Sequence, residues 1–286
     1  MPPDGTAGQA YKRPALKRAQ IGRTLTLYAI LIVYGSFVLA PILLILMASF
    51  QPSGVPSFVP EALTLKNYEK IVKDPRMRRG LLNSLIVAGG STVLSVLTSA
   101  LAGYAFSRFR FPGKNALMGI MLGIFMIPVL INIIPLFTMF QRIGWLDTYH
   151  GLIIPYQALI LPLNVWLLKN FFDTIPVDLE EAAMIDGASR MRAFWKVTFP
   201  LTWPGVAVAS IFAFRFSWNE FVFAATFTFQ SEMKTFQAAL YNFLGLGRTD
   251  WGALTAGVIV GMIPVVILFL IFQRRFIEGL TLGALK

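Results

Sequence analysis

The chain contains no cysteine among its 286 residues and a single histidine, His150. A disulfide framework, a thiol nucleophile and the common zinc and haem motifs all need residues that this sequence does not have. His150 follows a polar turn at the start of an apolar run, and a lone histidine there is typical of a surface residue rather than of a proton relay. We therefore expect neither a metal site nor a cofactor in this chain.

Catalytic motifs are also absent from the sequence. Neither Gly-x-Ser-x-Gly nor His-Glu-x-x-His occurs, and a single histidine suits an intramembrane protease poorly. The phosphate-binding loop Gly-x-x-x-x-Gly-Lys-Ser/Thr does not occur either. We expect a protein that is not an enzyme, so any ATP and magnesium that drive it would be bound by separate subunits.

Charged residues are few, at 14% of the chain, whereas hydrophobic residues make up 56% and the mean hydropathy is +0.66. A soluble domain of this length carries a larger charged fraction, so the composition indicates a multi-pass membrane protein. The formal net charge of +11 could point to nucleic acid. The basic residues instead flank apolar runs, where they set orientation and contact lipid headgroups, so no nucleic-acid partner is expected.

Six segments are apolar over about the 20 residues that a helix needs to cross a membrane: 25–49, 81–106, 116–140, 152–169, 205–229 and 253–273. The basic residues before the first run resemble the flank of a signal peptide, but the run is too long and no small-residue cleavage site follows it. Prolines within the runs predict kinks. The expected architecture is an all-α membrane protein with a basic arm at 1–24, a transmembrane domain at 25–273 and a tail at 274–286.

The distribution of lysine and arginine favours both termini in the cytosol. In that orientation most basic residues lie inside, and the short external loops carry only Arg142, Lys234 and Arg248. The first external loop weakens the assignment because it contains Lys66, Lys70, Lys73, Arg76, Arg78 and Arg79. The segment 170–204 then faces the cytosol.

This segment contains the most organised polar sequence in the chain, PVDLEEAAMIDGASRMRAFWKVTFPL at 176–201. Thr174 is a plausible cap for a first short helix, and the acids Asp178, Glu180 and Glu181 complement its positive end. Gly187 is placed for a left-handed turn. Ser189 can cap a second helix, which is expected to end at Pro200. One face of this helix is formed by Met191, Phe194, Trp195 and Thr198 and is largely apolar. The residues alone leave two interpretations open: an interfacial helix lying on lipid, or a docking element for a soluble partner.

The fifth apolar run is unusual because Arg215 lies near its middle, where a charge is costly. Helical spacing places Arg215, Trp218 and Asn219 on one face, whereas Glu220 points elsewhere. Arg215 could pair with a carboxylate of another subunit or reach the membrane surface. It could also line a translocation path together with Trp218, Asn219 and Glu220, and its planar fork would then suit an anionic saccharide.

The sequence Glu181-Ala182-Ala183-x-x-Asp186-Gly187-Ala188, with Phe194 and Leu201 after it, resembles the EAA motif of ABC importer permeases. The resemblance extends from about residue 25 to the C-terminus, and over this range the sequence is similar to the MalG-like carbohydrate-uptake permeases. Its further matches are GYAFSRFRFPGK at 103–114, GWLDT at 144–148, WNEF at 218–221 and GLT at 279–281.

The resemblance implies the type I ABC importer fold, with six transmembrane helices and a cytosolic helix-glycine-helix coupling loop in a bacterial inner membrane. It implies that this chain pairs with a second permease subunit and works with two ATP-binding subunits and an extracytoplasmic solute-binding protein. Contact with the ATP-binding subunits would involve the elbow residues Glu181, Ala182, Ala183, Asp186, Gly187 and Ala188. In the tail it would involve Thr281, Gly283 and Lys286, although Leu282 and Leu285 depart from the usual pattern there.

A secondary transporter or channel driven by an ion gradient is the alternative on physical grounds. Such proteins usually place ionisable residues in several spans and contain internal repeats. Here the fifth run alone carries such residues, and the two halves show no repeat. Import of a sugar or oligosaccharide driven by ATP is the favoured prediction.

Overall fold

The computed structural model describes residues 13–52, 57, 62–245 and 249–284, and at 13–21, 129 and 274–284 it describes the backbone alone. The described residues form helices without a named strand, apart from an isolated bridge between Leu244 and Thr249. The long helices are α1 (Arg13–Ser49), α3 (Pro75–Arg108), α6 (His150–Asp173) and α13 (Trp251–Ala284). In the described part of the chain these are the four helices that are long and apolar enough to cross a membrane alone.

The third expected span, at 116–140, is not one helix. It consists of α4 (Lys114–Ile124), a 3₁₀ turn (Val129–Asn132) and α5 (Ile133–Ile143). Pro128 has no amide hydrogen and forces the preceding residue away from helical geometry, so α4 ends before it. Pro135 falls in the first turn of α5, where an amide donor has no partner within the helix. These prolines therefore separate two helices instead of kinking one.

The fifth expected span, at 205–229, is also divided. Helix α10 (Trp203–Asn219) ends before Glu220, whose extended backbone (ψ 123°) leads into the short α11 (Val222–Phe227). At its other end, α10 meets the helical segment Arg190–Leu201 at an angle of 79°, and this bent pair could count as a fifth span. Helix α10 is therefore joined at a sharp corner to the loop that carries the elbow.

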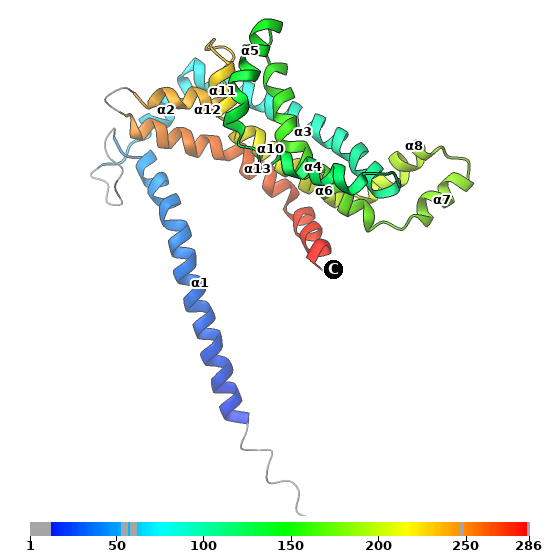
Figure 1. Ribbon diagram of the computed structural model, residues 1–286. Helices are drawn as coiled ribbons and strands as arrows, with labels where there is room; N and C mark the ends of the chain where they lie inside the picture. The colour runs from blue at the N-terminus through cyan, green and yellow to red at the C-terminus, as the bar shows by residue number, and fades with distance from the viewer. Residues whose placement is uncertain (1–12, 53–56, 58–61, 246–248, 285–286) are drawn as a thin grey trace, which may run out of the picture.

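The body of the molecule is built on α3, α6 and α10, which cross at close range (Figure 1). A Cβ atom on Gly103 of α3 would lie 3.0 Å from the backbone nitrogen of Lys169 and 3.2 Å from the carbonyl oxygen of Val165, so a larger residue would push the α6 backbone away. Between the helices, the Asn164 side chain donates to Ser95 Oγ (3.0 Å) and to the Ala209 carbonyl (3.2 Å). Small residues and interhelical hydrogen bonds hold such helices together in a bilayer.

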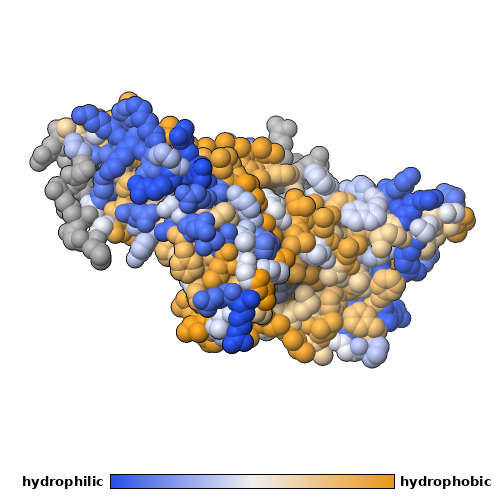
Figure 2. Space-filling model, turned by 90° about the horizontal axis from the view of Figure 1, so that it is seen from above, coloured by the Kyte–Doolittle hydropathy of each residue, from blue (hydrophilic) through white to orange (hydrophobic). Residues whose placement is uncertain are grey.

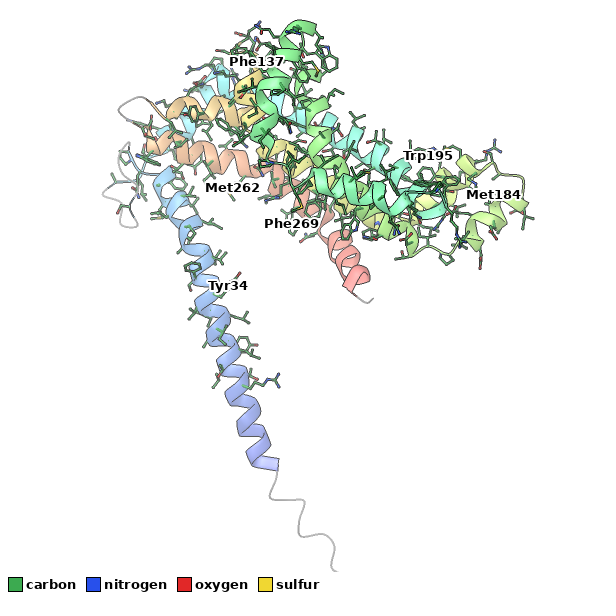
Figure 3. The ribbon with its side chains drawn as sticks, in the orientation of Figure 1. Tyr34, Phe137, Met184, Trp195, Met262 and Phe269 are labelled. Carbon is green, nitrogen blue, oxygen red and sulfur yellow. The ribbon has the colours of Figure 1, made fainter. Side chains whose placement is uncertain are left out.

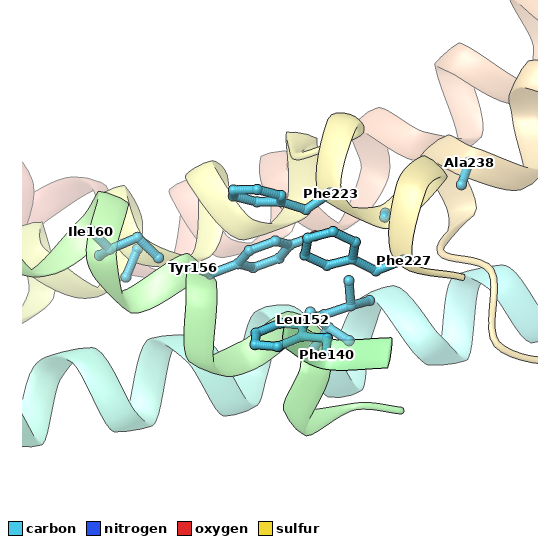
Figure 4. Close-up of a cluster of buried hydrophobic side chains, with 10 residues drawn as sticks. Phe140, Leu152, Tyr156, Ile160, Phe223, Phe227 and Ala238 are labelled. Atoms are coloured by element: carbon cyan, nitrogen blue, oxygen red, sulfur yellow. The ribbon is translucent and has the colours of Figure 1, made fainter. Parts of the chain in front are cut away.

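Aromatic and aliphatic side chains fill the centre of this body. One cluster gathers Phe140, Tyr156, Phe223 and Phe227 from α5, α6 and α11 (Figure 4). A second cluster lies at the end of α3 next to the loop, and a third joins α2 (Lys66–Lys73) and α12 (Phe236–Leu240) to α13. Gly257 and Gly261 on α13 face Leu240 and Phe236, whereas a Cβ atom on Gly119 or Gly123 of α4 would meet nothing within 4 Å.

Helix α1 projects away from the rest of the molecule (Figure 1); it packs against α13, and its last residue, Ser49, hydrogen-bonds to Asn67 and Tyr68 of α2. None of its most apolar window is buried, and Phe37 is 78% exposed. Apolar surface also covers much of the body between its polar ends (Figure 2). A helix that is apolar and exposed on all sides, as α1 is over this window, is suited to contact with lipid or with another apolar protein surface.

Candidate functional site

The candidate site is the loop between α6 and α10, which forms one tip of the molecule, far from α2 and α12 (Figure 1). It contains α7 (Asp178–Ile185), the elbow around Gly187 and a second helical segment that runs from Arg190 to Leu201. Met184 and Trp195 mark its two arms in Figure 3. The loop connects directly to α10 through the 79° corner.

The first arm begins differently from the prediction. Thr174 does not cap α7: its hydroxyl donates to the Phe171 carbonyl (2.7 Å) and closes the end of α6 instead. Val177 occupies the cap position of α7 and offers no side-chain acceptor. The acids Asp178, Glu180 and Glu181 do lie in the first turn, where carboxylates stabilise the positive end of the helix.

The elbow has the predicted geometry. Gly187 has φ +89°, a left-handed conformation that costs other L-residues energy. Its amide donates to the Met184 carbonyl (3.0 Å), and the Ala188 amide donates to the Ala183 carbonyl (3.0 Å), which is the Schellman pattern of a helix end. Ser189 Oγ then accepts from the Arg192 amide (3.4 Å) and caps the second arm.

The second arm is helical but not uniform. It comprises α8 (Arg190–Ala193), a π-helical turn (Phe194–Thr198) and α9 (Phe199–Leu201). Pro200 was expected to end this helix, yet the helix continues to Leu201. The wider π turn, in which the Phe199 amide donates to the Phe194 carbonyl, precedes a proline that cannot donate in the ladder.

The exposed apolar face expected on this arm is only partly present. Met191 and Trp195 are 56% and 39% exposed, but Phe194 and Thr198 are fully buried. The Phe194 ring lies 4.7 Å from the Tyr104 ring and 5.9 Å from the Phe172 ring, between centroids. Phe194 therefore fixes the arm to the ends of α3 and α6 and is not available to a partner.

A buried ion pair, which the sequence did not reveal, attaches α7 to the body. Arg108 Nε donates to Glu180 Oε1 (2.7 Å), and the Tyr104 hydroxyl donates to Glu180 Oε2 (2.7 Å). The side chains of Arg108 and Glu180 are 6% and 4% exposed. The available signal was the i, i+4 spacing of Tyr104 and Arg108 on α3, which places a hydroxyl and a cation on one face.

The residues predicted to contact an ATP-binding subunit lie at the free tip. Glu181, Ala182, Asp186 and Gly187 are exposed, while Ala183 and Ala188 are half-buried by the turn itself. Ile185 beside them is 86% exposed, and a Cβ atom on Gly187 would meet nothing within 4 Å. The tip therefore presents one exposed apolar side chain, Ile185, with the carboxylates of Glu181 and Asp186 beside it.

The four residues predicted for a translocation path have different surroundings in the structure. Arg215 and Asn219 are exposed. Trp218 is 1% exposed, and its Nε1 donates to the Gly261 carbonyl of α13 (2.9 Å). Glu220 accepts from the Tyr156 hydroxyl (2.7 Å) and from the amides of Phe223 (2.9 Å) and Ala224 (3.2 Å). Trp218 therefore serves helix packing and Glu220 the start of α11.

A hollow of about 240 Å³ lies beside Asn219, between α10 and α13. Its polar lining comes from Asn219 and Gln237, and Met262 (labelled in Figure 3) belongs to its apolar wall. The described residues contain no group of three or more His, Cys, Asp or Glu side chains that could hold a metal ion.

The predicted tail residues fall at the edge of the described chain. Thr281 and Gly283 lie in the last turns of α13, where the backbone alone is described. Lys286 lies outside the described residues, as does much of the N-terminal arm. His150 begins α6 and is exposed, with its ring 5.0 Å from that of Trp145.

The fold and loop define a helical membrane permease in which a short polar elbow is attached to the spans. Residues 95–281 match the family described as binding-protein-dependent transport system inner membrane component, and the chain belongs to this family. The chain is therefore a multi-pass permease of a binding-protein-dependent ABC importer, which works with a solute-binding protein and is not itself an enzyme. The alternative of a secondary transporter or channel is not favoured.

Two relatives that transport sugars match along nearly their whole length. The trehalose transport permease SugB of Mycobacterium tuberculosis is 39% identical over 92% of this chain and 98% of its own. The trehalose/maltose transport permease MalG of Thermococcus litoralis is 36% identical over 90% and 96%. The resemblance to MalG-like permeases is thereby confirmed.

Solved structures show the same fold. A chain of a bacterial ABC transporter that imports the acidic polysaccharide alginate has a TM-score of 0.77 at 22% identity, over 91% of this chain and 98% of that one. In a complex of a bacterial alginate transporter with a periplasmic protein bound to an alginate pentasaccharide, a chain has a TM-score of 0.67 at 17% identity, over 91% and 95%. The type I importer permease fold is confirmed.

Proposed function

We propose that the chain is one half of a heterodimeric permease that imports a sugar or oligosaccharide at the expense of ATP. A second permease subunit would complete the path, and two ATP-binding subunits would bind ATP and magnesium. The observation that supports this most directly is the exposed tip at Glu181, Ile185 and Gly187, held on a loop that continues into α10. The elbow would insert into the ATP-binding subunit and carry its closure to the spans.

The carbohydrate class rests on the relatives, which are named for trehalose, maltose and diacetylchitobiose transport. The proposed location is a bacterial inner membrane with both termini in the cytosol, because basic residues then concentrate inside. The elbow and the tail residues Thr281, Gly283 and Lys286 would then face the ATP-binding subunits.

Arg215 and Asn219 are proposed to line the path, since both are exposed on α10. No hydrogen bond or ion pair joins Arg215 to the described part of the chain. A guanidinium binds carboxylate and phosphate groups in two-point fashion, which favours an anionic saccharide as substrate. Arg215→Ala should then reduce uptake of acidic sugars while uptake of neutral ones persists; unchanged uptake of every acidic sugar tested contradicts this part of the proposal.

The test is to purify the native complex through a tag on this chain, reconstitute it in liposomes, and measure ATP hydrolysis and uptake. The binding protein would be loaded in turn with trehalose, maltose and an alginate oligosaccharide. We expect co-purification of a second permease and an ATPase, with hydrolysis stimulated by at least one loaded form. Uptake that follows an ion gradient without ATP would overturn the proposal.

A further inference from the structure

The guanidinium of Arg108 binds three different elements at once. Its Nε donates to Glu180 of α7 (2.7 Å), and its Nη2 donates to the Ile175 carbonyl (3.0 Å) in the turn before α7. Its Nη1 donates to the Phe172 carbonyl (3.0 Å) at the end of α6 and to Ser107 Oγ (3.0 Å) on α3 itself. One side chain therefore joins α3, the end of α6 and α7.

Both oxygens of the Glu180 carboxylate also have hydrogen-bond partners. One oxygen accepts from Arg108 and the other from the Tyr104 hydroxyl, and the pair is almost completely removed from solvent. Separating such a pair leaves a buried charge without compensation, which costs far more than separating an exposed pair. Helix α7 consequently cannot slide or rotate against α3 without a large penalty.

The rest of α7 has no comparable attachment. In the part of the chain that the structure describes, the side-chain hydrogen bonds and ion pairs of α7 are those of Glu180. Leu179 and Ile185 are 45% and 86% exposed, so they anchor α7 weakly within this chain. The aromatic contacts of Phe194 hold the second arm, but dispersion contacts are non-directional and do not fix the direction of α7.

We propose that Arg108, Glu180 and Tyr104 form a clamp that transmits displacement of α7 to α3 and α6. The three are positioning residues: they do not contact substrate or nucleotide, and they act by making α7 and the ends of two spans move as one body. The proposal rests on the proposed function, because it requires that a partner moves the tip of α7. It adds a route to the spans beside the two covalent connections of the loop, to α6 through residues 174–177 and to α10 at the corner after Leu201.

The clamp can be tested in the reconstituted complex with Glu180→Gln, which keeps the shape of the side chain but removes its charge. We expect the complex to assemble and to hydrolyse ATP, while uptake per ATP falls by about tenfold or more because α7 is no longer fixed. Tyr104→Phe removes a single hydrogen bond and should reduce uptake per ATP less. Glu180→Asp keeps the charge and should restore part of the loss. Arg110→Gln is the matched control, since Arg110 is exposed two residues beyond Arg108.

The readout is the ratio of uptake to hydrolysis, which a purely structural residue would leave unchanged in the complexes that form. Uptake per ATP in Glu180→Gln equal to that of the Arg110→Gln control overturns the clamp. So does failure of the Glu180→Gln chain to bind the ATPase, because the pair would then determine assembly instead of transmission. The proposed function fails in a different way: the unaltered complex itself would show no uptake driven by ATP.

Discussion

Two arginines on apolar helices show how differently one chain treats the same charge. Arg108 at the end of α3 is 6% exposed in its side chain and makes four hydrogen bonds to its own chain. Arg215 on α10 is exposed and has no such partner among the described residues. A charge is costly near the middle of an apolar run, as at Arg215, and also where protein buries it, as at Arg108. The charge of Arg108 is compensated within the chain and holds the loop in place, whereas the charge of Arg215 is free to bind a group outside the chain.

The largest expected difference is in stability. Arg108→Met leaves Glu180 buried without its cation and should destabilise the folded chain by about 3–5 kcal/mol. Arg215→Met should lower stability little or not at all, because no contact within the described chain is lost. The measurement is the unfolding midpoint of the purified permease in detergent, with Arg110→Met as the exposed control. Equal midpoints for the Arg108 and Arg215 variants would contradict the comparison.

The elbow should be next in size. Gly187→Val forces a β-branched residue into φ +89°, at a local cost of roughly 1–2 kcal/mol. Because a side chain there would meet open space, the membrane fold should survive while the tip changes direction. We expect ATP hydrolysis to continue and coupled uptake to be lost, as measured in proteoliposomes. Gly113→Val, at another exposed glycine with positive φ (79°), is the control; coupled uptake at the wild-type rate in Gly187→Val would refute the coupling role.

A third test concerns two neighbours on α10. Trp218→Phe removes the hydrogen bond to Gly261 and should cost about 1 kcal/mol of stability without changing which sugar is transported. Asn219→Ala should leave stability unchanged and alter the sugar concentration at half-maximal uptake, because Asn219 lines the hollow beside α13. Thermal midpoints and uptake curves of both variants separate the packing role of Trp218 from the sugar-binding role of Asn219. A change in sugar preference in Trp218→Phe, with none in Asn219→Ala, would contradict this assignment.

The smallest effect should come from the ion pair between Asp74, which is half-buried, and the exposed Arg76. Asp74 caps α3, and its hydrogen bond to Arg76 lowers the pKa of the Asp74 carboxyl. A lowered pKa means that the contribution is present above the unfolded value, about 4, and is lost as the pH falls through the folded pKa. Asp74→Asn should therefore cost less than about 1 kcal/mol at pH 7 and flatten the loss of stability in acid. Unfolding midpoints at pH 7 and below pH 4 measure it, and an unchanged acid profile would contradict the lowered pKa of Asp74.

Local chemistry made part of this structure predictable. The turn at Gly187 and the cap at Ser189 depend on residues within a few positions of each other, so the sequence predicted both correctly. The four long apolar helices follow from composition over about 20 residues. At Pro128 the sequence predicted a kink within one span, and this prediction was wrong, because α4 and α5 are separate helices there.

Other features required the fold. That Phe194 is buried while Trp195 is exposed depends on the ends of α3 and α6, which lie far away in sequence. The hydrogen bond from the Tyr156 hydroxyl of α6 to the Glu220 carboxylate, at the division between α10 and α11, also joins residues far apart in sequence. The translocation path itself stays a prediction; the structure adds only that Trp218 and Glu220 also bind within the chain, to Gly261 and to Tyr156.

The sequence by itself determined that this is a helical membrane permease, where its polar elbow lies and how that elbow turns, since hydrophobic runs and backbone preferences act over short stretches of chain. The tertiary structure alone decided that Glu180, and not its exposed neighbour Glu181, connects the elbow to the spans. The physical reason is that a carboxylate becomes a rigid attachment only when distant groups, here Tyr104 and Arg108, remove it from water and satisfy its oxygens together.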